Sequence, residues 1–452
     1  MVSADNLNFD CLELIFAHLS GNDLVSVLQV SRSFLAAVLP QLYRTLFFHL
    51  GNGKRYPKVI TAFDTVSLRP HLAVHVHNID IRLVPMAHHG TKLHPKFMSS
   101  LIQTLQRSVN LRTFTCTPSN LLPPLITTLR NCRSLQSVRL NPQLTVEQGK
   151  LLLELKTMKS IALDGASWNV VDMLPAWTLS VKSSLTSLML VNVQELNEPI
   201  LASVLSNLPH LQGLHVIACP KIEHGALLQS LVHTPALESL SFTAWDSRTL
   251  PENIFPLSHL RHLTIDVNFH SHVTGPPIDE TFEIWKHMIR KTRTWSCRLL
   301  SIMLRLSDKT LLPNSVIKEL LSAHGKTLTA IGLVSCDVDV TGLRLIAKRC
   351  DKLERLAVKI PAKEVIAFAD ALSRSRLLHT LHDITETHTN HGTPFLNTSS
   401  VNVIMDIVPS LMRVVSLGRV WTCERQRHLP HVFTVKLEKR VNPHLTYWFL
   451  LR

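Results

Sequence analysis

Residues 185–190 read LTSLML, with apolar side chains at the first, fourth and sixth positions. The same spacing returns at residues 211–216 (LQGLHV) and 237–242 (LESLSF), each time 26 residues further along the chain. Alternation of apolar and other residues over the last three positions suits a short strand with one buried face. A strand that recurs at a fixed distance predicts a repeat architecture.

The motif begins at ten positions in the middle of the chain, and nine of the ten first residues are leucine. The starts are Leu111, Leu135, Met158, Leu185, Leu211, Leu237, Leu260, Leu299, Leu328 and Leu353, with steps of 24, 23, 27, 26, 26, 23, 39, 29 and 25 residues. Most of these steps fall in the range of leucine-rich repeats. Because apolar residues make up 45% of the chain, the regular spacing carries more weight than any single copy.

Helical patterns such as residues 200–208 separate the predicted strands. Strand, loop and helix in repetition predict an α/β leucine-rich-repeat solenoid with a parallel sheet on its concave side. Outlying copies are expected around residues 76–81 and 412–417, with a weaker one near 378–381. The 39-residue step predicts an insertion at about 268–298, made of a loop followed by a helix that carries Arg290, Lys291 and Arg293. Residues 385–400 are expected to form a loop.

The first fifty residues have a different pattern. Apolar residues at 12, 15, 16 and 19 share one face of a helix, and two more short helices are expected from residue 22 or 23 and over about 31–38, before Pro40. Three helices of this length are marginal in isolation, so the module is expected to need a partner to cover a second apolar face.

This module resembles the F-box on several anchor segments in the family order. They are Leu7-Asn8-Phe9-Asp10, residues 15–19 (IFAHL), Asp23-Leu24, residues 30–34 (VSRSF) and Leu42-Tyr43-Arg44. Asn8 replaces the usual proline, and asparagine can cap a helix, so a helix start is still expected there. The resemblance implies docking of a Skp-type adaptor, and through it a cullin and a RING subunit. The positions that match the family's adaptor-facing or core set are Leu7, Leu12, Ile15, Phe16, Leu24 and Phe34.

In the repeats, the residues that flank the second and third apolar positions point away from the core and are expected to face a substrate. Six basic side chains at such positions are the candidate contacts: Arg139, His215, His262, Arg305, Arg355 and Lys359. Arginine binds carboxylate and phosphate groups with two hydrogen bonds, so an acidic or phosphorylated target segment is expected. An ordinary solvated surface is the alternative.

Amino-acid composition limits the expected cellular compartment and the expected class of binding partner. The formal net charge is +14, which favours an acidic partner, and the charge is spread along the chain rather than collected in a tail. The eight cysteines are scattered and contain no CxxC pair, so they are expected to be free and mostly buried in a reducing compartment. Without an apolar run of spanning length, a membrane is not expected, and the chain is placed in the cytoplasm, the nucleus or both.

No motif for a metal, a cofactor or catalysis was found among the 25 histidines or elsewhere, so no enzyme is expected. The predicted organisation is an F-box module at 1–50, a linker or capping segment at 51–74, irregular repeats at 75–430 and a C-terminal cap at 431–452. The predicted function is substrate recognition within an SCF-type ubiquitin ligase. The alternatives are a scaffold that acts outside a ligase and a basic platform for nucleic acid, the latter disfavoured by a 6% aromatic content.

Overall fold

The computed structural model describes residues 8–19, 21–48, 56–85, 93–245, 250–267, 278–384, 396–426, 429–438 and 450. The chain forms two compact units, Met1–His210 and Leu211–Arg452. The first unit holds the N-terminal helices and the first repeats, and the second holds the remaining repeats.

The first unit begins with three helices, α1 (Phe9–Phe16), α2 (Asn22–Val27) and α3 (Arg32–Tyr43). They pack around a small apolar cluster of Leu12, Phe16, Leu24, Ala37 and Val38. The start of α3 is encoded locally, since the hydroxyl of Ser31 accepts a hydrogen bond from the Phe34 amide at 3.2 Å. The predicted three-helix module is therefore present.

Two details of this module differ from the sequence expectation. The third helix does not end before Pro40 but continues through it to Tyr43. Proline removes one amide donor from the helix, and packing of Leu42 on the apolar cluster offsets that loss. Asn8 directly precedes α1, but its side chain makes no capping hydrogen bond.

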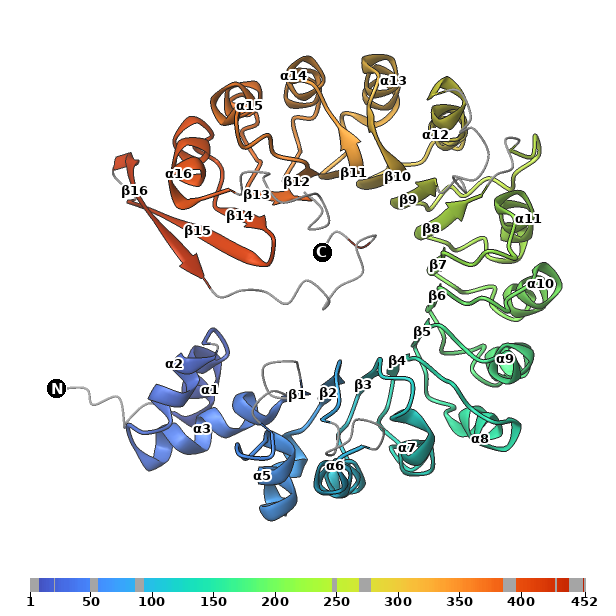
Figure 1. Cartoon of the computed structure of the whole chain (residues 1–452), viewed down its shortest axis with the longest axis vertical. Helices are drawn as coiled ribbons and strands as arrows, with labels where there is room; N and C mark the ends of the chain where they lie inside the picture. Colours follow the sequence, from blue (N-terminus) through green and yellow to red (C-terminus); the bar gives the residue numbers. More distant parts are fainter. Residues whose placement is uncertain are drawn as a thin grey trace. The chain divides into compact units, whose positions relative to one another are not determined.

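The sheet of the first unit is parallel, and its strands follow the order of the sequence (Figure 1). Its strands are β1 (Thr45–Phe48), β2 (Asn78–Ile81), β3 (Thr113–Cys116), β4 (Ser137–Leu140), β5 (Ser160–Asp164) and β6 (Ser187–Val191). The connecting helices are α5 (Ala62–Leu68), η2 (Pro70–His75), α6 (Pro95–Arg107), α7 (Leu122–Leu129), α8 (Val146–Lys150), η3 (Leu151–Glu154), α9 (Trp168–Ser180) and α10 (Glu198–Ser206). The sheet thus begins at residue 45, and a helix of the array lies within residues 51–74.

The second unit repeats this plan and then closes with an antiparallel hairpin. Its parallel strands are β7 (Gly213–Ile217), β8 (Ser239–Ala244), β9 (His262–Val267), β10 (Ser301–Leu311), β11 (Ala330–Asp337), β12 (Arg355–Val358), β13 (Thr380–Asp383) and β14 (Arg413–Ser416). The helices are α11 (His224–Ser230), η4 (Leu231–His233), α12 (Ile278–Thr294), α13 (Asn314–His324), α14 (Val340–Arg349), α15 (Val365–Leu372) and α16 (Thr398–Ile407). Strands β15 (Arg419–Gln426) and β16 (Leu429–Glu438) form the hairpin, and β15 pairs antiparallel with β14.

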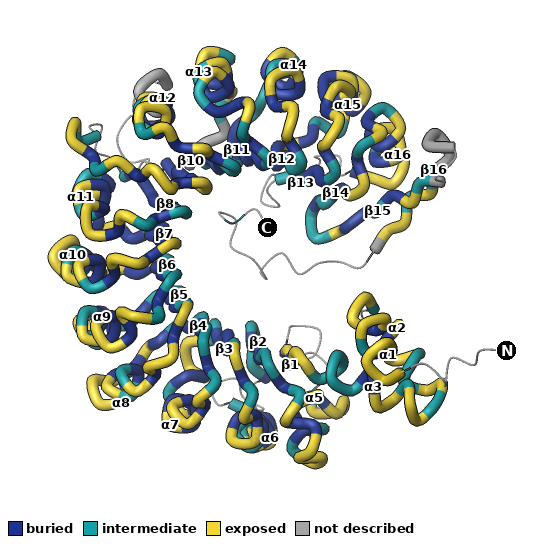
Figure 2. Tube along the Cα trace, turned by 180° about the vertical axis from the view of Figure 1, so that it is seen from behind, coloured by how far each residue is buried: buried dark blue, intermediate teal, exposed yellow. Residues whose placement is uncertain are grey.

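The recurring leucines form the core of both units. The first leucine of each motif is almost fully buried, as are the apolar residues of the strands that follow it. Figure 2 shows that burial is concentrated on the strands and on the helix sides that face them, within each unit. The α/β repeat fold with a parallel sheet is therefore confirmed, and strands β2 and β13 confirm the outlying copies at 76–81 and 378–381. A strand, β14, is also present near 412–417, but the expected register was wrong by one residue, because Leu411 and Val414 are buried and Met412 is 45% exposed.

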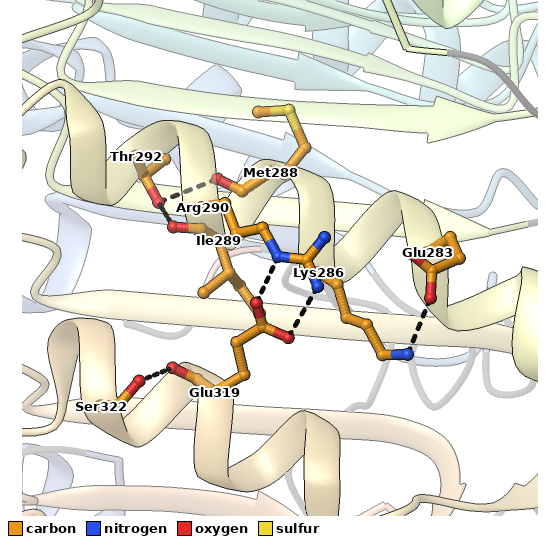
Figure 3. Close-up of polar contacts among 8 residues, drawn as sticks. All are labelled: Glu283, Lys286, Met288, Ile289, Arg290, Thr292, Glu319 and Ser322. Atoms are coloured by element: carbon orange, nitrogen blue, oxygen red, sulfur yellow. Dashed lines mark hydrogen bonds and ion pairs between the residues drawn. The ribbon is translucent and has the colours of Figure 1, made fainter.

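The predicted insertion is a helix, α12, although the loop expected at 268–277 lies outside the described residues. Arg290 of α12 forms a bidentate ion pair with Glu319 of α13, with Nε–Oε1 and Nη2–Oε2 distances of 2.5 and 3.3 Å (Figure 3). Lys291 donates to the backbone oxygen of Glu252. Residues 398–400, expected in a loop, form the first turn of α16, because the Asn397 side chain caps that helix by accepting from the Ser400 amide.

Candidate functional site

The first candidate surface lies on α1–α3. The structure divides the predicted adaptor set into two environments: Leu12, Phe16 and Leu24 belong to the buried cluster, whereas Ile15 is 49% exposed. Phe34 is partly buried and packs its ring 5.1 Å from that of Phe16, measured between centroids. Leu7 lies outside the described residues. Of the described members, Ile15 is the most available to a partner.

Several apolar side chains outside the predicted adaptor set are exposed on these helices and on the turn between α2 and α3. They are Phe9 (43% exposed), Leu14 (69%), Val25 (44%), Val30 (64%) and Leu35 (38%). Sequence reasoning missed them because the helical period marks the stripe that packs on the core, and these residues lie off that stripe. The signal that could have found them is that off-stripe positions of a surface helix are normally polar.

The second candidate surface is the face of each sheet that points away from the helices, here called the open face. In the first unit this face carries Arg139 on β4, whose Nε lies 2.6 Å from a carboxylate oxygen of Asp164 on β5. Both side chains are only 18% exposed. Arg139 is thus held in a partly buried ion pair across neighbouring strands.

In the second unit, His215 of β7 is 2% exposed, and its Nδ1 lies 2.7 Å from the Ser241 hydroxyl of β8. Thr264 of β9, the neighbour of Ser241 in the sheet register, is also buried. His215 therefore stabilises the sheet locally and offers almost no surface to a ligand.

A cationic group lies further along this open face, over β9–β14. The strand register places His262 and Arg355 in one row, and Arg413 of β14 continues that row. Burial, together with Arg413 and Arg355, lowers the pKa of His382 on β13 to about 4. Desolvation and the charges of Arg261 and Arg355 also lower the pKa of His262, against the opposing effect of Glu238. At neutral pH the positive charge here belongs to the arginines, and both imidazoles are neutral.

The remaining two predicted contacts have acidic neighbours. Arg305 lies 3.9 Å from Asp266, which is 3% exposed and accepts a 3.0 Å hydrogen bond from the Thr243 hydroxyl. Burial raises the pKa of Asp266, while Arg305 and Thr243 oppose that rise. Lys359 forms a 2.8 Å ion pair with Asp337. The structure thus brings His262, Arg305, Arg355 and Lys359 onto one sheet. It also adds Arg413 and His382, which were not among the predicted contacts because they belong to the less regular repeat copies.

Metal binding has no candidate site in the part of the chain that the structure describes. There, no group of three or more His, Cys, Asp or Glu side chains is arranged to hold a metal ion. All eight cysteines are free thiols, and seven of them are buried. Among the described helices, none combines the length and apolar character needed to cross a membrane.

Comparison with known proteins supports the assignment of the N-terminal helices. Residues 5–41 match the model of the F-box domain, which confirms the resemblance seen in the sequence. Matched solved structures include a chain of the yeast Rad7–Elc1 complex (TM-score 0.47, 12% identity, covering 87% of this chain and 97% of that one). Another is a chain of the Toll–Spatzle complex from Drosophila (TM-score 0.30, 13% identity, covering 81% and 53%). No curated protein matches the chain.

Proposed function

We propose that this F-box protein is the substrate-recognition subunit of an SCF-type ubiquitin ligase. Helices α1–α3 would dock a Skp-type adaptor, which bridges to the cullin and the RING subunit. The repeats would hold a protein target while those other subunits transfer ubiquitin. In this proposal the chain supplies binding surfaces and no catalytic group.

The observation that carries the adaptor half of the proposal is the apolar surface of the F-box helices. Residues 5–41 match the F-box domain, and six large apolar side chains between residues 9 and 35 are 38–69% exposed. Burial of apolar area contributes about 25 cal/mol per Å², so a partner that covers these side chains gains a substantial driving force. Scattered exposed apolar residues are normal, but this many on three short helices and the turn between α2 and α3 favours an interface.

The target half of the proposal rests on the second unit. Arg355 and Arg413 lie in one register row of the open face, two strands apart, with the neutral ring of His382 near both. Two guanidinium groups at this spacing suit an acidic or phosphorylated segment, because each can bind an anionic group with two hydrogen bonds.

Affinity purification from cells, with bound proteins identified by mass spectrometry, tests the adaptor half. The test variant is Leu14→Lys with Ile15→Lys, at positions 69% and 49% exposed. The matched control is Ile366→Lys with Leu377→Lys, at positions 63% and 52% exposed in the second unit. Both variants gain two positive charges, but only the test variant places them on the F-box helices. Phe16 is left unchanged because its replacement would disrupt the core.

The parent chain and the control are expected to retain adaptor and cullin, and the test variant is expected to lose both. Retention of the adaptor without any cullin would instead favour a scaffold that acts outside a ligase. Absence of the adaptor from all three samples would contradict the proposal.

A second pair of variants tests the target half in the same assay. The Arg355→Glu, Arg413→Glu variant is expected to keep the adaptor and to lose the target proteins that bind to the open face. Lys318→Glu with Lys363→Glu, which makes the same charge change at exposed sites on α13 and after β12, is expected to retain them. Identical sets of retained proteins in the two variants would rule out recognition through Arg355 and Arg413.

A further inference from the structure

Basic residues collect at one edge of the sheet in the first unit. Because β3–β6 are parallel, all four strands begin at the same edge, here called the amino edge, and end at the opposite carboxyl edge. The loops that enter these strands (108–112, 130–136, 155–159 and 181–186) contain six Lys or Arg residues and no Asp or Glu. The loops that leave them (117–121, 141–145, 165–167 and 192–197) contain no Lys or Arg and a single acid, Glu195.

The six cations of the amino edge are all exposed: Arg112, Arg130, Arg133, Lys156, Lys159 and Lys182. Arg130 forms an ion pair with Glu154, with an Nη1–Oε1 distance of 3.5 Å. For the other five, the described part of the chain supplies no ion-pair partner. These five residues are called the basic edge below, and their charge is available to a ligand.

The backbone fixes the spacing within the basic edge. The Gln136 amide donates to the Arg112 oxygen at 2.8 Å, and the Lys159 amide donates to the Gln136 oxygen at 2.7 Å. Arg112 and Lys159 are therefore two steps apart on one ladder, a separation of about 10 Å at the usual strand spacing. The backbone therefore fixes the separation of two of the five cations, with the uncharged Gln136 between them.

Helix stability accounts for only part of this accumulation, because Lys156 and Lys182 directly follow the C-caps Leu155 and Val181, where a cation compensates the macrodipole. Cations stabilise a helix only within its last turn, where they compensate the macrodipole. Arg112 follows the end of α6 at Arg107 by five residues, and Lys159 follows the end of η3 at Glu154 by five. Like charges held close together repel each other, so their accumulation at one edge favours an external anionic partner.

We propose that the basic edge binds an acidic, extended segment of a partner protein, with an acidic side chain at about every third position. A polyproline II segment repeats every three residues and rises about 3.1 Å per residue, so side chains three positions apart lie on one face about 9 Å from each other, close to the separation of Arg112 and Lys159. Single-stranded nucleic acid is a poorer fit, because the four amino-edge loops contain no Phe, Tyr or Trp on which bases could stack. This surface is separate from the open face and from the F-box helices, and it requires no ligase.

Fluorescence anisotropy with the full chain and labelled peptides tests the proposal without any adaptor. The probe is a 15-residue peptide with glutamate at every third position and Gly, Ser or Thr elsewhere, and the comparison peptide has the same glutamates in one block. The edge variant carries Arg112→Gln, Arg133→Gln, Lys156→Gln and Lys159→Gln. The control variant loses the same charge at exposed lysines elsewhere, by Lys58→Gln, Lys96→Gln, Lys318→Gln and Lys363→Gln.

The spaced peptide is expected to bind the parent, with affinity that falls as salt is added. The edge variant is expected to weaken binding about tenfold or more, and the control variant by about twofold or less. Equal weakening in both variants, or equal binding of the two peptides, would overturn the proposal. Binding of a 15-base-pair DNA duplex in place of the peptide would overturn it in favour of nucleic acid. Circular dichroism checks that both variants keep the parent's fold.

Discussion

Ile15 and Phe16 are adjacent in α1 and match the same F-box segment, yet they have opposite environments. Phe16 is 4% exposed and packs against Phe34, whereas Ile15 is 49% exposed. A motif that mixes core and interface positions cannot separate these roles, because both require an apolar residue. Only the packing of α3 on α1 decides which side chain holds the module together and which is left for a partner.

Truncation of Phe16 tests this division. Phe16→Ala should lower the free energy of opening of α1–α3 by about 3 kcal/mol or more, since it removes a large buried side chain from a small core. Leu14→Ala, at a position 69% exposed, should change that free energy by about 0.5 kcal/mol or less. Amide hydrogen exchange of the three helices measures both. Similar losses from the two variants would show that the core is not built around Phe16.

Thiol reactivity gives a second test at the scale of single residues. Cys11 is exposed and the other seven cysteines are buried, and burial raises the pKa of Cys116 to about 12. Because the thiolate is the reactive form, iodoacetamide at pH 8 should label one cysteine of the native chain. Mass spectrometry of the intact protein counts the labels, and Cys11→Ser should remove the fast one. Two or more sites that react equally fast would contradict the burial pattern.

At the scale of elements, α12 and α13 are joined by a polar contact beneath their ion pair. His324, at the end of α13, is 3% exposed, and its Nε2 lies 2.9 Å from the hydroxyl of Thr292 on α12. The single proton of that hydroxyl is directed at the Met288 and Ile289 backbone oxygens within α12 (Figure 3). Burial lowers the pKa of His324 to about 4, with a smaller contribution from Arg293.

A buried histidine of this kind makes stability depend on pH. The folded state keeps His324 neutral down to about pH 4, whereas the unfolded chain binds a proton below about 6.5. Stability should therefore fall as the pH drops from 6.5 towards 4, by about 2 kcal/mol between pH 7 and pH 5 from this residue alone. Urea unfolding of the parent and of His324→Gln at both pH values isolates the effect. An identical pH dependence in the two proteins would contradict it.

The repeated strands and helices could be predicted from the sequence, whereas the side-chain contacts between them could not. Leucine spacing identified strands that the structure confirms, because a buried strand face requires apolar residues at fixed positions. The pairing of Arg305 with Asp266, and of Lys359 with Asp337, depends on the register of neighbouring strands. Burial of His215 is also a consequence of its neighbours, since its own sequence position is that of an outward-facing residue.

At the scale of the whole molecule, the spatial distribution of charge was the property that could be predicted least well from the sequence. The net charge of +14 is spread along the chain, yet within the first unit the loop cations gather at the amino edge of the sheet. Loops 20 or more residues apart become neighbours only when the strands stack in order. The order of the F-box helices and the repeats, by contrast, could be predicted from the sequence, because the two regions have different hydrophobic periods.

In the proposed function, the exposed apolar side chains of the F-box helices bind a Skp-type adaptor. Isothermal titration of purified adaptor into the full chain tests it most directly, with Leu14→Lys, Ile15→Lys as the test variant and Ile366→Lys, Leu377→Lys as the control. One adaptor per chain is expected to bind the parent and the control, and the affinity is expected to weaken about tenfold or more in the test variant. Absence of binding to the parent, or equal affinity for all three proteins, would contradict it.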